Sequence, residues 1–329
     1  MAVLNAYRSF NSFNIYAFAG TTISATSSKL SLIDPVGSLE LNYADLRVDY
    51  GGSFKYLGGY LSSGTLKSAT VYVDSLKYYA VTGTYDMLTY VDHALGTTDD
   101  FLSYVFGGND TFNGSRQNDV ILCGITGNDK FYGNGGNDLI FTNLGYKSTV
   151  DGGSGNDYIV IAGNSDSIKG GVGADVFNIL VWTNSDKDFI SDFNVSQGDM
   201  ISIGIGMAGV TNDLITKFNF NTATSEYEPY ATQVSVVTGA STSQSSDNYF
   251  IYDKKTGNLY YDQDATGGTY SSELIVNFSN KPAFTVAQLA GQVIQIYDVS
   301  MSGFDPLFSS FLTHNTVDYP YLPFGVGFA

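Results

Sequence analysis

The stretch that decides the fold of this chain is Gly-Gly-Val-Gly-Ala-Asp-Val-Phe-Asn, residues 170–178. It is a nonapeptide of the form Gly-Gly-x-Gly-x-Asp-x-apolar-x, in which a glycine-rich turn leads into a short alternating segment. Glycine permits the positive φ angles of a tight turn, and the alternation points one side chain inward and its neighbours outward, as in a strand. A single unit cannot bury its apolar residue alone, so the pattern predicts stacked repeats.

Looser copies of this nonapeptide precede it and keep a common register. The repeat aspartates recur at a step of nine or ten residues, with one gap at which Lys147 occupies the expected place. These aspartates are Asp110, Asp119, Asp129, Asp138, Asp157, Asp166 and Asp175. The glycines that shape the turns are Gly108, Gly127, Gly136, Gly152, Gly155, Gly170 and Gly173. Random richness in Gly and Asp does not keep such a register, so residues 106–182 are predicted to form a parallel β-roll.

The predicted roll has one inward apolar residue per turn, with Thr149 in that place in the irregular turn. The inward residues are Phe112, Ile121, Phe131, Ile140, Ile159, Ile168 and Phe177. A core that thin does not offset roughly 1 to 2 kcal/mol of backbone entropy per residue, and a stack of carboxylates repels itself. Ca²⁺ resolves both difficulties because it takes about six to eight oxygen ligands from carboxylates and turn carbonyls. Folding is therefore expected to be coupled to calcium, with the aspartates and glycines named above forming the metal sites.

Two nonapeptides make one coil, so successive turns alternate between two edges of the roll. The first edge is predicted to stack Asp119, Asp138, Asp157 and Asp175 and to hold up to three ions between neighbouring pairs. The second edge is predicted to stack Asp110, Asp129, Lys147 and Asp166, with one good site between the first two. The Lys147 ammonium is expected to cancel the sites around it, which gives about four Ca²⁺ ions in all.

Composition agrees with a cation as the partner. The chain has 32 acidic and 15 basic residues and a sequence pI near 4.2, which argues against binding to nucleic acid or to anionic membrane surfaces. Cys123 is the single cysteine, so no disulfide framework is expected. No run approaches the roughly 18 apolar residues of a membrane span, and the first residues lack the pattern of a Sec-type signal peptide.

The segments on either side of the repeats are β-like, so the predicted fold class is all-β. Residues 1–105 are expected to form an antiparallel β module, with strands over 69–73 and 77–81 and short capping helices over 84–95 and from 98. Residues 106–182 form the roll. Residues 183–329 are expected to form a C-terminal β module followed by a Phe-rich tail.

At the repeats the sequence resembles the RTX proteins, which type I secretion systems export from bacteria. The segment after them resembles the C-terminal module of serralysin-type secreted proteins. The matching pieces there are Asp188 to Phe193, Gly198-Asp199, Tyr252-Asp253, Tyr261-Asp262 and Asp264. The resemblance covers about residues 106–290. It implies a secreted or cell-surface protein that the type I secretion machinery exports unfolded on an uncleaved C-terminal signal, and that folds in extracellular calcium. For Asp262 and Asp264, a polar turn is favoured over a further ion site.

The resemblance does not specify an activity, because the same repeats occur beside many functions. A protease of the serralysin type needs His-Glu-x-x-His, and the two histidines, His93 and His314, stand far apart with no adjacent Glu. A lipase needs Gly-x-Ser-x-Gly, which does not occur. The favoured hypothesis is therefore a non-enzymatic, calcium-stabilised structural or adhesive protein of a matrix, surface layer or cell contact, with self-association as one possibility.

Two alternatives stay open for residues 1–105. In the first, a Tyr-rich face of the N-terminal module binds a glycan, host molecule or partner protein. Its candidate residues are Tyr43, Tyr50, Tyr56, Tyr60, Tyr72, Tyr78 and Tyr79. In the second, the module is a hydrolase with an unrecognised pair of carboxylates. Candidates for that pair are Asp45, Asp49, Asp74 and Asp86.

Overall fold

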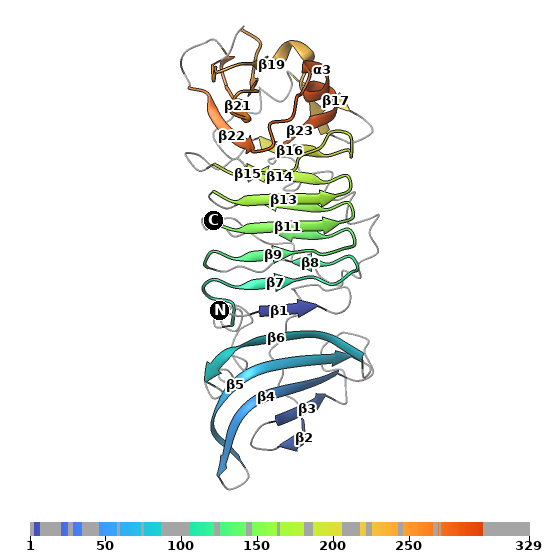
Figure 1. Cartoon of the computed structure of the whole chain (residues 1–329), viewed down its shortest axis with the longest axis vertical. Helices are drawn as coiled ribbons and strands as arrows, with labels where there is room; N and C mark the ends of the chain where they lie inside the picture. The colour runs from blue at the N-terminus through green and yellow to red at the C-terminus, as the bar shows by residue number, and fades with distance from the viewer. Residues whose placement is uncertain are drawn as a thin grey trace. The chain divides into compact units, whose positions relative to one another are not determined.

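The structure of the chain is a computed structural model (Figure 1). The residues it describes are 3–6, 21–25, 29–34, 46–57, 60–73, 76–86, 105–121, 126–142, 147–162, 165–180, 187–205, 218–221, 226–242, 246–265, 269 and 271–298. The chain divides into two compact units, one of residues 1–134 with 317–329 and one of residues 135–316, and each is described by itself. The described elements are nearly all strands, which confirms the all-β fold class. The predicted module boundaries at residues 105 and 182 stay predictions.

The first unit contains an antiparallel sheet followed by the first coil of the roll. Its strands are β1 (Val3–Ala6), β2 (Thr21–Ala25), β3 (Lys29–Asp34), β4 (Leu46–Leu57), β5 (Tyr60–Val73), β6 (Leu76–Asp86), β7 (Thr111–Asn113), β8 (Val120–Ile121) and β9 (Lys130–Tyr132). Strands β2 to β6 pair as antiparallel neighbours in chain order. Strand β1 pairs antiparallel with β6 on one side and parallel with β7 on the other, so the first residues of the chain join the sheet to the coil.

Strands β5 and β6 confirm the two strands predicted in this unit. The predicted helix over 84–95 is wrong for its first three residues, because β6 continues to Asp86 and pairs there with Thr65 of β5. The rest of that segment, and the second predicted helix, lie outside the described residues. Tyr50, Phe54 and Leu66 are buried, and Tyr50 therefore does not belong to an exposed aromatic face.

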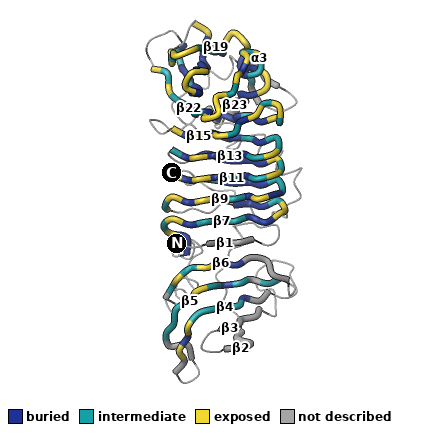
Figure 2. Tube along the Cα trace, viewed as in Figure 1, coloured by how far each residue is buried: buried dark blue, intermediate teal, exposed yellow. Residues whose placement is uncertain are grey.

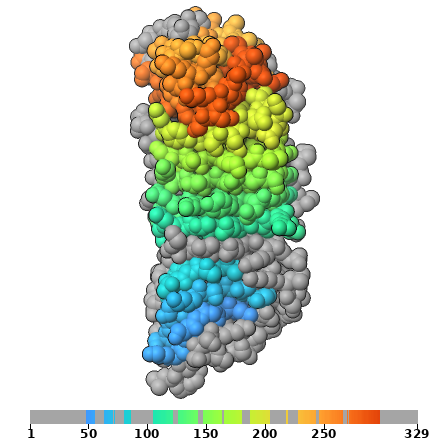
Figure 3. Space-filling model, in the orientation of Figure 1, coloured from blue at the N-terminus to red at the C-terminus, as the bar shows by residue number. Residues whose placement is uncertain are grey.

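The second unit contains the regular coils of the roll. The strands β10 (Leu139–Phe141), β12 (Tyr158–Ile161) and β14 (Val176–Leu180) pair in parallel in one sheet, and β11 (Thr149–Ser154) and β13 (Ser167–Val172) pair in parallel in the other. The chain alternates between the two sheets, which confirms the predicted solenoid. Buried and exposed residues alternate along β11 and β13 (Figure 2), and the successive coils of this unit lie in direct contact (Figure 3).

The roll has a thicker core than the sequence predicted. Every predicted inward apolar residue is at most 1% exposed. In β12, however, Tyr158, Ile159, Val160 and Ile161 are all buried, so this strand is covered on both faces. The expectation for Thr149 is wrong. It is exposed and Val150 is buried in its place, because ten residues rather than nine separate this turn from the one before it.

The C-terminal part of the second unit extends both sheets of the roll. Its described elements are β15 (Phe189–Ile190), β16 (Met200–Ile205), β17 (Asn219–Asn221), β18 (Glu226–Glu228), η3 (Ala231–Gln233), β19 (Val234–Val237), β20 (Phe250–Asp253), β21 (Asn258–Tyr261), β22 (Glu273–Phe278), α3 (Val286–Gln288), η5 (Leu289–Val293) and β23 (Ile294–Asp298). Strand β22 pairs with β15 in one sheet, and β23 pairs with β16 in the other. The predicted C-terminal β module is thus confirmed as β structure.

An aromatic cluster fills the end of the roll. The ring of Phe193 lies 4.9 Å from that of Phe278 and 5.6 Å from that of Phe284, both edge to face. The ring of Tyr252 lies 4.9 Å from Phe284. Edge-to-face pairs of this kind add to the energy of apolar burial. The cluster closes the apolar core that the coils would otherwise leave open at this end.

Candidate metal-binding edges of the roll

Two rows of turns join the two sheets, and we call them the first and the second edge. In the second unit the described turns of the first edge are 135–138, 152–157, 170–175 and 192–199, and the first unit has a turn of the same kind at 114–119. The second edge includes the turns that end at Asp110 and Asp129 in the first unit and at Ser148, Asp166 and Asp188 in the second. Parts of the second edge lie outside the described residues.

The third glycine of the repeat allows neighbouring coils to approach closely. These glycines have φ angles between +100° and +142°, a region that L-residues rarely adopt. They are Gly108, Gly127, Gly136, Gly155 and Gly173. A Cβ atom on Gly155 would lie 2.0 Å from the carbonyl oxygen of Gly136, and one on Gly173 would lie 1.8 Å from that of Gly155. The backbone conformation therefore favours glycine at all five positions, and at Gly127, Gly155 and Gly173 the lack of space requires it as well.

The repeat aspartates form ladders of hydrogen bonds along both edges. In each step the backbone N–H of one turn donates to Oδ1 of the aspartate one coil later. On the first edge the donor–acceptor pairs are Asp138 to Asp157 (2.9 Å), Asp157 to Asp175 (2.9 Å) and Asp175 to Asp199 (3.1 Å). On the second edge they are Asp110 to Asp129 (2.7 Å), Ser148 to Asp166 (2.6 Å) and Asp166 to Asp188 (2.9 Å).

These ladders agree with the predicted stacking of Asp138, Asp157 and Asp175 within the second unit, and of Asp110 with Asp129 within the first. All the repeat aspartates are at most 2% exposed. The predicted pair Asp119/Asp138 has one residue in each unit, and it stays a prediction.

The expectation for Lys147 is wrong. The register of β11 and β13 sets Thr149 opposite Ser167, so Ser148 is the residue opposite Asp166. Ser148 is fully buried, whereas Lys147 is exposed. The ten-residue step between Asp138 and Ser148 moves the turn by one position. The second edge is thus interrupted by a small hydroxyl and not by an ammonium group.

The second carboxylate oxygens of Asp157 and Asp175 have no hydrogen-bond partner among the described residues, although both are buried. A Cβ atom on Gly152 would lie 2.3 Å from Asp157 Oδ2 and 2.5 Å from the carbonyl oxygen of Gly170 in the next coil. Two oxygens from neighbouring coils therefore lie close together against the Cα of Gly152, a close approach that only glycine allows. A Cβ atom on Gly170 would likewise lie 2.3 Å from Asp175 Oδ2.

In the first unit, Asp119 has a different environment. A Cβ atom on Gly114 would lie 2.8 Å from Asp119 Oδ2 and 2.5 Å from the carbonyl oxygen of Gly133, so the same oxygens converge. The N–H of Ser115, however, donates to Asp119 Oδ2 (2.5 Å), and the Ser115 hydroxyl donates to Oδ1 (3.2 Å). Because Ser115 stands where the regular repeat has its second glycine, this turn satisfies its own carboxylate.

Burial raises the pKa of the carboxyl groups along the first edge. Desolvation is the main cause for Asp157, whose pKa rises to about 8, with the charge of Asp175 adding to it. The same cause raises the pKa of Asp175 to about 6 and that of Asp199 to about 7. The backbone N–H donors of the ladder oppose these shifts in all three cases. A cation held between the turns would reverse them by favouring the ionised form.

The donor set fits a hard cation such as Ca²⁺. The converging atoms are carboxylate and carbonyl oxygens, which Ca²⁺ prefers and which soft metals do not. Within the described ranges, no cluster of three or more His, Cys, Asp or Glu side chains surrounds one point. Turn carbonyls would therefore have to complete each coordination shell, as the repeat pattern predicts.

Comparison with known proteins identifies the repeat. Residues 104–122 and 124–146 match the family model of the RTX calcium-binding nonapeptide repeat (4 copies). No curated protein and no solved structure matches the chain. The chain therefore carries RTX-type calcium-binding repeats in a β-roll, and the structure continues the same coil through residues 147–180. The serralysin-like character of the C-terminal module is not confirmed.

The structure adds residues that the sequence spacing did not assign to the edges. Asp188 and Asp199 each extend one ladder by a further coil, and Ser148 fills the gap in the second edge. Asp188 and Asp199 follow their predecessors by 22 and 24 residues, so a step of nine does not find them. Asp264 accepts a hydrogen bond from the N–H of Thr269 (2.7 Å), in agreement with the polar turn expected there.

Proposed function

We propose that this chain is a secreted, non-enzymatic protein whose roll folds when Ca²⁺ binds between its coils, and which serves a structural or adhesive role outside the cell. The observation that carries the proposal is the pair of buried oxygens, Asp157 Oδ2 and Asp175 Oδ2, that lack a hydrogen-bond partner among the described residues. A buried carboxylate without a partner is costly. A divalent cation between the turns provides the interaction partner that this carboxylate lacks.

The negative charge of the chain also supports binding of Ca²⁺ between the coils. The chain carries a formal net charge of −17 at pH 7, and the ladders bring aspartates that are 18 or 19 residues apart in sequence next to one another in successive coils. Without a cation, such a stack either repels itself or takes up protons, as the raised pKa values of Asp157 and Asp175 indicate. The free energy of Ca²⁺ binding is then part of the free energy of folding.

The proposed ligands are the repeat aspartates together with the carbonyl groups of the turn glycines. The best-supported ligands of one ion are Asp157 Oδ2 and the carbonyl oxygen of Gly170, which approach each other beside Gly152. Asp138 and its ladder partner Asp157, and Asp110 with Asp129, offer equivalent positions. The repeats thus offer several ion positions, and the number of about four ions stays part of the proposal.

The need for calcium supports folding outside the cell, and the RTX-type repeats support export by type I secretion machinery. Extracellular modules bind Ca²⁺ with dissociation constants of about 0.1 to 1 mM, so a roll of this affinity stays unfolded inside the cell and folds outside it. No helix in the described part of the chain is long and apolar enough to span a membrane. Self-association, or contact with an extracellular glycan or protein, would then be the role of the folded chain.

A calcium titration tests the proposal. The full chain is treated with EDTA, and far-UV circular dichroism is recorded as Ca²⁺ is added. We expect a cooperative gain of β signal at high-micromolar to millimolar Ca²⁺, together with heat of binding in calorimetry. A chain that shows full β signal in EDTA and no heat with Ca²⁺ would overturn the calcium account. Light scattering on the same samples then tests for calcium-driven self-association.

A further inference from the structure

The first edge ends in a turn that is not a nonapeptide. The parallel pairing of β13 and β15 sets Ile190 opposite Ile168, and the N–H of Ser191 donates to the carbonyl oxygen of Ile168 (2.9 Å). Two residues further along this register, Asp192 stands beside Gly170. The position that the previous coils fill with the first glycine of the repeat, Gly152 and Gly170, is therefore occupied by an aspartate in the last coil.

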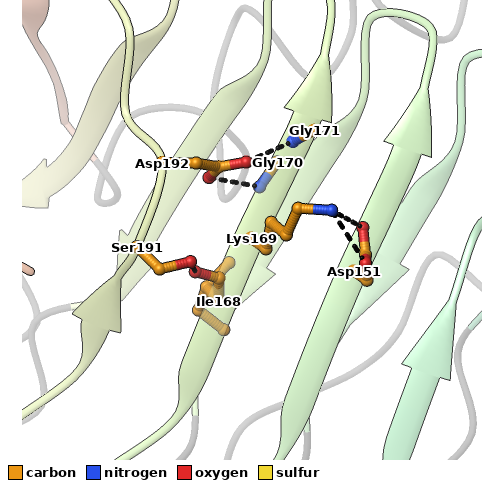
Figure 4. Close-up of polar contacts among 7 residues, drawn as sticks. All are labelled: Asp151, Ile168, Lys169, Gly170, Gly171, Ser191 and Asp192. Atoms are coloured by element: carbon orange, nitrogen blue, oxygen red, sulfur yellow. Dashed lines mark hydrogen bonds and ion pairs between the residues drawn. The ribbon is translucent and has the colours of Figure 1, made fainter. Parts of the chain in front are cut away.

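The Asp192 carboxylate is held against the turn before it. The N–H of Gly170 donates to one of its oxygens (3.0 Å) and the N–H of Gly171 donates to the other (2.9 Å), as Figure 4 shows. Asp192 is only partly buried. Each of its oxygens accepts one hydrogen bond from these glycines, which leaves further lone pairs for a cation.

Gly170 brings this carboxylate close to the buried oxygen of Asp175. Asp175 Oδ2 lies over the Cα of Gly170, at 2.3 Å from where a Cβ would stand, while Asp192 binds the N–H of the same residue. In the coil before, the equivalent space over Gly152 receives the carbonyl oxygen of Gly170. Over Gly170 the three nearest atoms belong to Asp175 and Phe177, and no carbonyl of the following coil is among them.

Asp199, the last aspartate of the first-edge ladder, has a hydrogen-bond donor for each of its carboxylate oxygens. Asp199 accepts a hydrogen bond from the N–H of Asp175 at Oδ1 (3.1 Å) and from the N–H of Asn194 at Oδ2 (2.8 Å). It therefore fixes the shape of the turn, and the charge available to a cation at this end comes from Asp175 and Asp192. The charge of Asp192 also acts on Asp175, raising its pKa further.

We propose that Asp175 and Asp192 bind a terminal Ca²⁺ ion, in which the Asp192 carboxylate replaces the carbonyl oxygen that a further repeat would supply. This inference rests on the proposed calcium-dependent function. Two carboxylates then bind this ion, as in the sites proposed between neighbouring repeat aspartates, and Asp192 supplies the charge that Asp199, whose oxygens both accept hydrogen bonds, does not. Because ligand charge sets Ca²⁺ affinity, removal of the Asp192 charge should weaken the binding of this ion.

The first test compares Asp192→Asn with Asp247→Asn by calorimetric titration of the full chain with CaCl₂ after removal of calcium. Asp247 is a matched control, because it is an exposed aspartate between β19 and β20, outside the turns of both edges, whereas Asp151 directly precedes the turn 152–157 and its charge acts on Asp157. We expect Asp192→Asn to lose one ion, or to bind it on the order of tenfold more weakly. Asp247→Asn should bind as the unchanged chain does. Equal binding by all three chains would overturn the inference.

Two further comparisons separate a ligand from a turn-forming residue. Asp192→Glu and Asp192→Gln have the same length and differ in charge, so tighter Ca²⁺ binding by the Glu variant supports the inference and equal binding contradicts it. If Asp175 and Asp192 share one ion, Asp175→Asn combined with Asp192→Asn loses no more ions than Asp175→Asn alone. Loss of one more ion by the double variant than by Asp175→Asn would refute the shared site. An unchanged chain that binds no Ca²⁺ would instead refute the proposed function itself.

Discussion

Asp157→Asn should stabilise the calcium-free roll at neutral pH while removing much of its response to calcium. In the folded chain without calcium, burial raises the pKa of Asp157 from 3.8 to about 8. At pH 7 the folded state must therefore hold a proton that the unfolded state does not. The cost is about 4 kcal/mol, from the roughly three pH units between 3.8 and 7 at 1.36 kcal/mol each. Asparagine has no such cost.

The amide also fits the local geometry. Its oxygen can accept the hydrogen bond that the N–H of Asp138 now donates to Asp157 Oδ1 (2.9 Å). Its Nδ2 would stand near the carbonyl oxygen of Gly170, because both Oδ2 and that carbonyl lie within 2.5 Å of one point over Gly152. A hydrogen bond there replaces the cation. The gain in the free energy of unfolding is therefore expected to approach the 4 kcal/mol of the proton cost.

Urea unfolding in EGTA, followed by circular dichroism, measures this gain. A group with a raised pKa stabilises the fold below its unfolded value, and that stability is lost as pH rises through the folded value. The calcium-free chain should therefore lose stability between about pH 4 and pH 8, and Asp157→Asn should flatten this slope. With saturating Ca²⁺ the order reverses and the unchanged chain is the more stable. If Asp157→Asn were less stable than the unchanged chain in EGTA at pH 7, the reasoning from burial would be wrong.

Three further predictions follow from the turns. Gly173→Ala places a Cβ 1.8 Å from the carbonyl oxygen of Gly155 at a φ of +142°, so it should cost about 2 to 5 kcal/mol in urea unfolding with calcium present. Gly291→Ala, with nothing within 4 Å, should cost less, and equal losses would contradict the close approach of the coils. Ser148→Asp restores a carboxylate to the second edge and should add an ion or tighten binding in calorimetry, whereas an unchanged titration would show that the edge needs more than this ligand. Ca²⁺ affinity should fall by up to about tenfold per pH unit below pH 8, because the proton on Asp157 must be displaced; affinities equal at pH 8 and pH 6 would argue against a buried carboxylate ligand.

Most of the roll could be predicted from the sequence because the spacing within each repeat is regular. Each inward residue follows its aspartate by two positions, and the alternation of a strand then fixes which side chain enters the core. Phe112, Ile159 and Phe177 are buried as that rule requires. The prediction failed at the turn whose aspartate is replaced by Ser148, because no carboxylate marks its position, and there Val150 and Ser148 take the places expected for Thr149 and Lys147.

The sequence by itself determined that this chain stacks Asp/Gly turns into a β-roll and that oxygen ligands for calcium recur along it, because both properties belong to a single nonapeptide. Only the tertiary structure decided which carboxylates keep an oxygen without a partner and which are satisfied by their own turn, as Asp157 and Asp119 illustrate. It also brought Asp192 to the position beside Gly170 across an irregular segment. Those outcomes depend on hydrogen bonds between coils, and the register that sets them is fixed when the coils pack.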